Sequence, residues 1–354
     1  MAILYVTEPG AQVHKEANRL LVKKGGEVVD EIPIGNIDQV VLMGRGVGLT
    51  TSALHALTRR GVHIVYLTGS GGYVGEVKGK EHKHSRLRFE QAQWVADRQN
   101  ALLTARSIVS GKIQNQRTLV QRHASQENWS QRALGGMDRM AQKAQRTHNV
   151  DELRGVEGQG AKEYFGIFRQ ILRPPADGRS WRFEQRAYYP PPDPVNAMLS
   201  FSYTLLLKDM TTACEMAGLD PGLGCLHEID YGRPSMALDL IEEFRPIIAD
   251  SIVLYAVNRP LVRLQDFEEV PFQKKVDPRE IPEDILDTGK RAVYLVGEAR
   301  KEFLSVYEHR VNELAYYPAT GEQRSYRDIF QLQVYHMARV ILGEERSYQP
   351  FVVR

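Results

Sequence analysis

The sequence contains only two cysteines among its 354 residues, Cys214 and Cys225. They are too few for a disulfide scaffold and do not form a C-x-x-C pair, so we expect buried free thiols without redox or zinc chemistry. The sequence also lacks any run of about 18 uninterrupted apolar residues and a signal peptide of the usual basic and apolar composition. These absences predict a cytoplasmic protein that does not associate with a membrane.

Two common enzyme signatures are missing as well. The glycine-rich stretch that starts at Gly44 does not have the G-x-G-x-x-G spacing, and no P-loop lysine follows it, so a nucleotide-binding loop is not predicted. His227 is followed by glutamate, but position 231 is Tyr231, which excludes the H-E-x-x-H motif of zinc proteases. The composition, with 42% hydrophobic and 25% charged residues, is that of an ordinary globular protein long enough for two domains.

The pattern of apolar residues changes near residue 85. Before it, short alternating segments and glycine turns predict strands, with one short helix at 51–60. The expected strands are 3–6, 19–23, 28–33, 37–42, 63–67 and 73–77. After it, long helical periodicity prevails. We therefore predict an α+β protein of two domains, a small β-rich domain at 1–85 and a larger all-α catalytic domain at 86–354.

Two helices in the second domain have clear start signals. Asp193 and Pro194 are suited to the N-cap and first position of a helix that ends near Gly218. Pro234 is suited to the first position of another helix, which we expect to continue to Phe244. Its apolar stripe faces a core, and the opposite side carries the two carboxylates Asp239 and Glu242 one turn apart. His227 lies a short turn ahead of this helix. A solvated acidic face is the alternative interpretation.

Glu157 argues against a purely solvated acidic face. If its segment is helical, Glu157 shares a face with Ala161, Tyr164, Phe168 and Leu172. A carboxylate on an apolar face must be protonated, paired with a cation such as arginine, or bound to a metal. Two acidic side chains and an imidazole would form a mixed nitrogen and oxygen site suited to Mg²⁺ or Mn²⁺. Such a site is typical of phosphodiester chemistry.

Four segments together resemble the CRISPR-associated spacer-acquisition integrases, the Cas1 family. They are similar to that family's glutamate motif, Asn/Tyr helix, histidine motif and acidic motif, and they read GVEGQGAKEYF, DPVNAMLSFSYTLLL, GLDPGLGCLH and GRPSMALDLIEEFRP. Their order and spacing agree with the family. The similarity continues through IIADSIVLYAVNRP and GKRAVYLVGEARKEFLSVYEHRV, and it therefore covers nearly the whole chain.

The resemblance implies roles for the candidate residues. Glu157, His227 and Glu242 would be the catalytic residues and metal ligands, with Asp239 as an auxiliary acidic residue close by. The implied activity is that of a metal-dependent DNA endonuclease and integrase, which inserts new spacers into a CRISPR array by attack of a 3′-hydroxyl on repeat DNA.

The implied partners are the prespacer duplex and the CRISPR leader-repeat. The resemblance also implies a homodimer joined through the β domains, assembled with Cas2 into a heterohexamer, and a Cas4-like nuclease as a further partner.

Basic residues are concentrated in two stretches, although the net charge of the chain is only +2. Residues 78–88 contain five Lys or Arg and one acidic residue, and residues 98–146 contain nine against two. These stretches are candidates for phosphate contacts, with a solvated helical surface as the alternative. The DNA-binding candidates are Lys78, Lys80, Lys83, Arg86, Arg88, Arg117, Arg122, Arg132 and Arg245.

Two other functions use the same residues. One is a structure-selective nuclease of DNA repair that cuts without joining ends. The other is a DNA-binding scaffold in which the acidic cluster has only a structural role. A joining assay separates the first from an integrase, and unaltered DNA binding and activity in chelator would favour the second.

Overall fold

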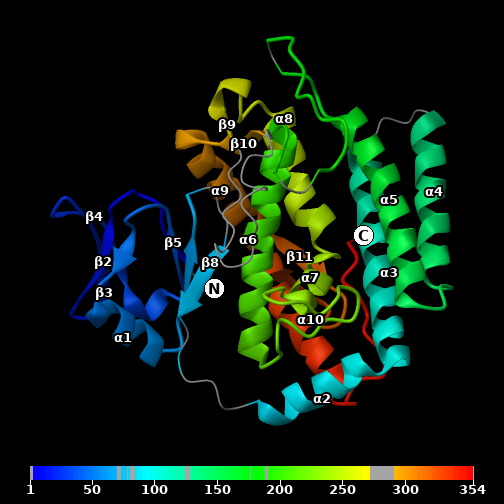
Figure 1. Cartoon of the computed structure of the whole chain (residues 1–354), viewed down its shortest axis with the longest axis horizontal. Coiled ribbons are helices and arrows are strands. Elements are labelled where there is room, and N and C mark those ends of the chain that lie inside the picture. Colours follow the sequence, from blue (N-terminus) through cyan, green and yellow to red (C-terminus); the bar gives the residue numbers. More distant parts are fainter. Residues whose placement is uncertain are drawn as a thin grey trace, which may run out of the picture. The chain divides into compact units, whose positions relative to one another are not determined.

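The computed structural model describes residues 3–69, 73–77, 79, 84–123, 128–175, 177–187, 190–271 and 291–353. The chain divides into two compact units, Met1–Arg86 and Leu87–Arg354. The first is rich in strands and the second is mostly helical, which confirms the predicted fold class (Figure 1). Among the described residues, no helix is both long enough and apolar enough to cross a membrane.

The N-terminal unit contains two four-stranded sheets. The first has the order β1 (Ile3–Val6), β5 (Gln39–Met43), β7 (His63–Leu67) and β8 (Tyr73–Val77). Its first three strands are parallel, and β8 pairs antiparallel with β7. The second has the order β4 (Glu27–Pro33), β3 (Arg19–Lys24), β2 (Gln12–Glu16) and β6 (Gly48–Leu49). The sequence did not predict β2 or β6.

Helix α1 (Thr51–Arg59) belongs to the same unit and begins with a side-chain cap. The Thr50 hydroxyl accepts a hydrogen bond from the backbone N–H of Ala53 at 3.3 Å, which satisfies one of the free donors at the helix start. Leu57 of this helix is fully buried with strand residues such as Val13 and Ile64. The inward-facing side chains of both sheets therefore share one core with α1.

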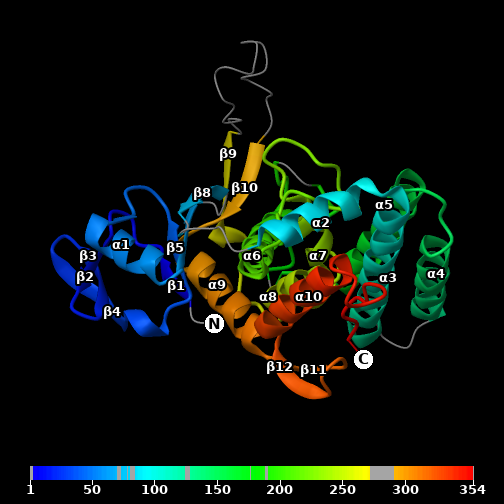
Figure 2. The same ribbon diagram turned by 90° about the horizontal axis from the view of Figure 1, so that it is seen from below.

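The C-terminal unit is built from long helices with shorter segments between them. The helices are α2 (Ser85–Ala96), α3 (Arg98–His123), α4 (Asn128–Ala144), α5 (Val150–Ile171), α6 (Pro194–Ala217), α7 (Ser235–Ile241), α8 (Ser251–Asn258), α9 (Gly297–Asn312) and α10 (Tyr326–Ile341). Helices α3, α4 and α5 lie side by side (Figures 1 and 2), while α6 is buried along most of its length.

Two strand pairs correct the expectation of an all-α second domain. Strand β9 (Phe267–Pro271) pairs with β10 (Arg291–Leu295), and β11 (Leu314–Tyr317) pairs with β12 (Glu322–Ser325). Each pair is antiparallel and short. Such segments are hard to distinguish from loops by hydrophobic periodicity, because each strand is only four or five residues long.

The predicted caps of α6 are confirmed. Asp193 is the N-cap and accepts a hydrogen bond from the backbone N–H of Asn196 at 2.9 Å, and Gly218 ends the helix in the left-handed conformation at φ 87°. The prediction for the acidic helix was partly wrong, because α7 ends at Ile241 and Pro234 is its N-cap.

A π-helical segment follows at Arg245–Asp250. Pro246 has no N–H to donate to the carbonyl four residues earlier, so a regular α-helix cannot continue through Glu242.

The C-terminal tail lies against α3, as Figures 1 and 2 both show. The Asn115 amide donates to the carbonyl oxygens of Phe351 and Glu243, both at 2.8 Å, and its oxygen accepts from the N–H of Val353 at 3.0 Å. The Glu243 carboxylate accepts from the Tyr348 hydroxyl at 2.9 Å and from the Phe351 N–H at 3.0 Å. Burial raises the pKa of Glu243 to about 8. The tail therefore ties α3 to the segment that carries the acidic motif.

The close contact between α3 and the tail predicts opposite effects for two glycine substitutions. A Cβ atom at Gly111 would lie 2.4 Å from Cβ of Pro350, whereas a Cβ atom at Gly155 of α5 would meet nothing within 4 Å. We expect Gly111→Ala to lower the free energy of unfolding by about 1–3 kcal/mol through overpacking. Gly155→Ala should raise it by about 0.5–1 kcal/mol, because alanine is the better helix former. Urea denaturation measures both, and equal stabilities would contradict the packing of the tail.

Candidate active site

The structure brings the three predicted ligands into one cluster in the C-terminal unit. Glu157 lies on α5, His227 lies in the loop between α6 and α7, and Glu242 is the residue that follows α7. Lys112 of α3 pairs through its ammonium group with Glu157 and, at 2.6 Å, with Oε2 of Glu242. The Nε2 atom of His227 lies 3.8 Å from Oε1 of Glu242. Two carboxylates therefore share one cation, with an imidazole nitrogen beside them.

Lys112 is the central residue that the sequence analysis missed. Its side chain is buried, and burial alone would lower its pKa, but the charges of Glu157 and Glu242 outweigh this effect and raise it. The ammonium group therefore stays charged. A signal was present in the sequence, because Lys112 lies one helical turn after the buried Ile108 and Val109 of α3. A lysine on a buried helix face requires an acidic partner.

Glu242 is almost completely buried and has two cationic partners. Besides Lys112, the Nη1 atom of Arg245 donates to its Oε1 at 2.6 Å. Burial alone would raise the pKa of Glu242, but the positive charges of Arg245 and Lys112 hold it at about 2. Glu242 is therefore ionised at neutral pH and provides a negative charge next to His227.

Asp239 has a different environment from Glu242. Its fully buried carboxylate accepts backbone N–H groups from Cys225, Leu226 and His227 at 2.5, 2.9 and 2.9 Å, and it also contacts Nδ1 of His227 at 2.7 Å. Because an ionised carboxylate can only accept hydrogen bonds, the contact with Asp239 places the proton of the imidazole on Nδ1. The lone pair of a neutral His227 is then on Nε2, which is the atom nearer to Glu242. Asp239 thus orients the imidazole.

A glycine allows the histidine loop to approach α7 closely enough for these contacts. A Cβ atom at Gly224 would lie 2.6 Å from the backbone carbon of Ser235 and 2.8 Å from Oδ2 of Asp239. Any side chain there would push the loop away from the Asp239 carboxylate. The G-C-L-H stretch is therefore held by backbone hydrogen bonds that depend on the absence of a side chain at position 224.

Glu157 lies at the edge of the apolar face predicted for it. Val156, Gly160 and Tyr164 of α5 are buried, whereas the Glu157 side chain is 26% exposed. The expectation that its charge needs compensation is confirmed, and the cation is Lys112 instead of an arginine. The exposed edge leaves Glu157 open to solvent on one side of the cluster.

A buried chain of polar groups continues from the cluster into the core. The guanidinium of Arg245 stacks on the ring of Tyr203 at 4.8 Å. The hydroxyls of Tyr203 and Tyr164 each donate to the Asp250 carboxylate at 2.7 Å. Burial raises the pKa of Asp250 to about 6 despite these hydrogen bonds. These residues come from three segments, so no single motif in the sequence predicted the chain.

The predicted DNA-binding residues have several different environments. Lys78, Lys80 and Lys83 lie outside the described residues. Arg245 is buried and pairs with Glu242, and DNA binding by this arginine stays a prediction.

Arg86, Arg122 and Arg132 are exposed on α2, α3 and α4, respectively. Arg88 donates to the Gly218 carbonyl at 3.3 Å, and Arg117 pairs with Asp138 at 2.8 Å. DNA binding by these five arginines stays a prediction.

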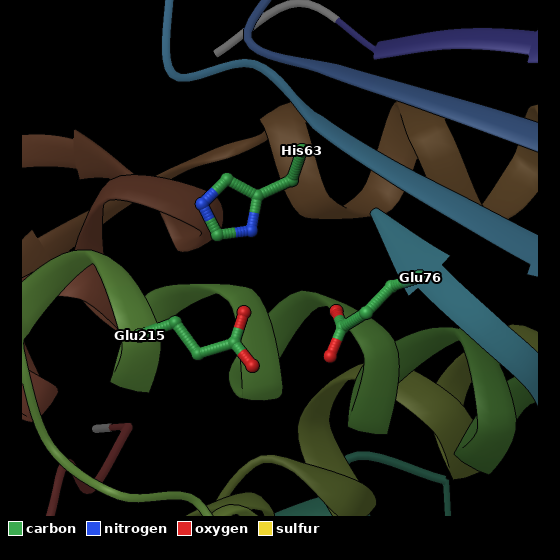
Figure 3. Close-up of side chains that lie close together, drawn as sticks. All are labelled: His63, Glu76 and Glu215. Atoms are coloured by element: carbon green, nitrogen blue, oxygen red, sulfur yellow. The ribbon is translucent and has the colours of Figure 1, made fainter. Parts of the chain in front are cut away.

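Figure 3 shows three further side chains with metal-ligating atoms, His63, Glu76 and Glu215. His63 and Glu76 lie on the neighbouring strands β7 and β8 of the N-terminal unit, and Glu215 lies on α6 of the C-terminal unit. The positions of the two units relative to each other are not determined. The three residues are therefore not assigned to a common site.

The sequence places the chain among the CRISPR-associated proteins. The family model of CRISPR associated protein Cas1 matches residues 4–309. The chain belongs to the Cas1 family, and the resemblance inferred from the motifs is confirmed.

Relatives of the chain carry corresponding names. CRISPR-associated endonuclease Cas1 3 of Thermus thermophilus is 34% identical over 356 residues, which is 100% of this chain and 98% of the relative. CRISPR-associated endonuclease Cas1 1 of Chlorobaculum tepidum is 33% identical over 360 residues, covering 99% and 98% of the two chains. A Cas4/Cas1 fusion of Geobacter sulfurreducens is 34% identical over 356 residues, and the match spans 60% of the fusion's length.

Solved structures share the fold. A Cas1 protein from Thermotoga maritima has a TM-score of 0.78 at 24% identity, covering 100% of this chain and 99% of that one. A chain of a Cas6-RT-Cas1–Cas2 complex has a TM-score of 0.81 at 21% identity over 99% of this chain and 36% of its own. A casposase bound to its integration product has a TM-score of 0.79 at 20% identity, covering 99% and 93%.

Removing the shared cation should destabilise the cluster. Lys112→Met leaves the buried Glu242 with Arg245 alone and Glu157 without its partner, so we expect the free energy of unfolding in chelator to fall by about 3–5 kcal/mol. Lys162→Met, on the exposed face of α5, is the matched control and should change it by less than about 0.5 kcal/mol. Urea denaturation of both variants measures the difference. A Lys112 variant as stable as the control would mean that the two carboxylates do not need a shared cation.

Proposed function

We propose that the cluster of Glu157, His227 and Glu242 is the metal-dependent active site of a DNA endonuclease and integrase that inserts spacers into a CRISPR array. The observation that carries the proposal is the convergence of two carboxylates on one buried cationic position, with His227 held beside it by Asp239. Membership of the Cas1 family supports the same activity.

The residues of the cluster suit a divalent ion. Two carboxylates and a neutral imidazole nitrogen are ligands that Mg²⁺ or Mn²⁺ accepts, and the carboxylates already balance the positive charge of Lys112. Glu157, His227 and Glu242 would hold the ion. When bound, a divalent ion would polarise the scissile phosphate and offset the charge that develops on its oxygens.

The proposed reaction is a transesterification. The 3′-hydroxyl of the incoming DNA attacks a phosphorus atom of the repeat strand and loses its proton as a new P–O bond forms. The original P–O bond to the leaving 3′-oxygen breaks, and that oxygen takes up a proton, so no net proton is released. Asp239 fixes the tautomer and the direction of His227, so that Nε2 is available as a ligand. Arg245 and Lys112 keep Glu242 ionised while it is buried.

The assembly that we propose follows the names of the relatives. A Cas2 partner and a Cas4-like nuclease are supported by the Cas1–Cas2 complex and the Cas4/Cas1 fusion among the similar proteins. We propose further that the chain forms a homodimer through its β-rich domain and a heterohexamer with Cas2. Its DNA substrates would be the prespacer duplex and the leader-repeat.

The three proposed ligands can be tested by joining. Glu157→Ala, His227→Ala and Glu242→Ala should each abolish the Mn²⁺-dependent formation of a branched product from a labelled 3′-hydroxyl donor and a supercoiled repeat-containing target. Thermal melts provide a second readout, because Mn²⁺ at about 100 times its Kd should stabilise the wild type by about 2.7 kcal/mol and each variant far less. Near-normal joining by the Glu157 or His227 variant would reject the ligand set. Cutting without joining by the wild type would favour a repair nuclease.

Asp239 should behave as an orienting residue. Asp239→Asn cannot accept all four of the present hydrogen bonds, so His227 loses its fixed direction while Glu157 and Glu242 remain. We expect joining to fall by about 10- to 100-fold and to recover partly as the Mn²⁺ concentration is raised. Asp230→Asn, at an exposed position of the same loop, is the control and should join normally. Complete inactivity at all Mn²⁺ concentrations, as for Glu242→Ala, would make Asp239 a direct ligand.

A further inference from the structure

A second concave site lies in the C-terminal unit between the end of α3, helix α8 and the second half of α9. Its cavity has a volume of about 690 Å³, which lies within the usual range of ligand pockets. Arg122, which lines the cavity, lies ten residues after Lys112 of the acidic cluster on the same helix, α3. Ten residues correspond to about 15 Å along a helix axis. The cavity is therefore separate from the acidic cluster, and of its described lining residues only Arg122 is among the DNA-binding candidates named above.

The lining of this cavity is strongly basic. Among the lining residues that the structure describes, four are arginines and two are histidines, and Glu313 is the sole carboxylate. Glu313 already pairs with Arg310 and, at 3.3 Å, with His309. A net positive cavity of this kind attracts an anion, and the planar fork of arginine is suited to phosphate oxygens.

One arginine has a structural role and two are presented to the cavity. Arg310 donates to the Ile247 carbonyl at 2.9 and 2.7 Å and is thereby fixed to the core. Arg173 and Arg259 are exposed. The side chain of Asn258 holds the backbone beside Arg173 by accepting the Arg173 N–H at 2.8 Å and donating to the Ile171 carbonyl at 3.1 Å. The backbone of Arg173 is therefore held in place before any ligand binds.

An aromatic ring lies among these cations. Tyr255 is 43% exposed, and the guanidinium of Arg259 lies 5.1 Å from the centre of its ring. Exposed aromatic rings beside arginines are the surfaces on which unpaired nucleobases stack, whereas a duplex keeps its bases stacked on each other. An acidic peptide would use the arginines but would not need the ring.

We propose that this cavity binds a nucleobase and its neighbouring phosphate in a single-stranded polynucleotide, with Tyr255 under the base and Arg173 and Arg259 on the phosphate. The inference rests on the proposed function, because an enzyme that joins DNA ends handles strands beyond the reacting phosphate. It differs from that function in that binding here requires neither the divalent ion nor the acidic cluster.

The test measures strand binding in chelator. The readout is the fluorescence anisotropy of a labelled oligothymidylate mixed with the full-length protein. Tyr255→Ala should weaken binding by roughly 5- to 150-fold, the range expected for one stacked base, and Tyr255→Phe should bind like the wild type. Arg173→Ala and Arg259→Ala should each reduce the slope of log K against log salt by about 0.7. Arg346→Ala, an exposed arginine outside the cavity, is the control and should bind as tightly as the wild type.

Two competitors identify the ligand. Competition by ADP with the same dependence on Tyr255 would support the site and assign it to free nucleotides, whereas failure of ADP to compete would support assignment to a strand. Competition by poly-glutamate with no effect of Tyr255→Ala would overturn the proposal in favour of an acidic protein partner.

Equal binding by the wild type and all cavity variants would also overturn it. If the wild type does not join DNA but its strand binding still depends on Tyr255, Arg173 and Arg259, the proposed function is rejected and this site is retained.

Discussion

The compensation of buried charge at Lys112 is the constraint on which the rest of the cluster depends. Two carboxylates from α5 and the end of α7 meet at one ammonium group on α3, so the three segments are joined by charge as well as by packing. Neither of the two buried groups, Lys112 and Glu242, is stable there alone, because an isolated charge in the interior is strongly unfavourable. Arg245 adds a second positive charge on the inner side of Glu242, and Glu157 keeps an exposed edge. The cluster is thus closed toward the core and open toward solvent.

The histidine is organised by a different kind of interaction. Three consecutive backbone N–H groups and the imidazole converge on the single carboxylate of Asp239, and this arrangement is possible because Gly224 has no side chain. Asp239 and Glu242, one turn apart in the sequence, therefore have separate tasks. The hydrogen bonds from the histidine loop occupy the acceptor atoms of Asp239. Glu242 instead faces its cationic partners and Nε2 of His227.

Much of the fold could be predicted from local rules of sequence, whereas the acidic cluster could be predicted only in part. The caps of α6 at Asp193 and Gly218 and the alternating strands were predicted because turn chemistry and side-chain periodicity act over a few residues. The end of α7 was missed because the effect of Pro246 appears four residues upstream. Lys112 was missed because its partners lie 45 and 130 residues away along the chain, and no local pattern pairs them. The motif resemblance selected the ligand candidates, and their different partners then distinguished Asp239, which accepts from the histidine loop, from Glu242, which pairs with Lys112 and Arg245.

The tail that binds Asn115 and Glu243 has a consequence for the order in which the protein folds. Tyr348 and Phe351 contact Glu243 across 105 and 108 residues, and Phe351 contacts Asn115 across 236. During synthesis these tail residues emerge after the helices against which they pack, and contacts of such long separation form slowly. Until they form, the buried carboxylate next to Glu242 has no tail donor. The helical unit can therefore be nearly complete before the tail locks Asn115 and Glu243, and these contacts are among the last that the newly made chain forms.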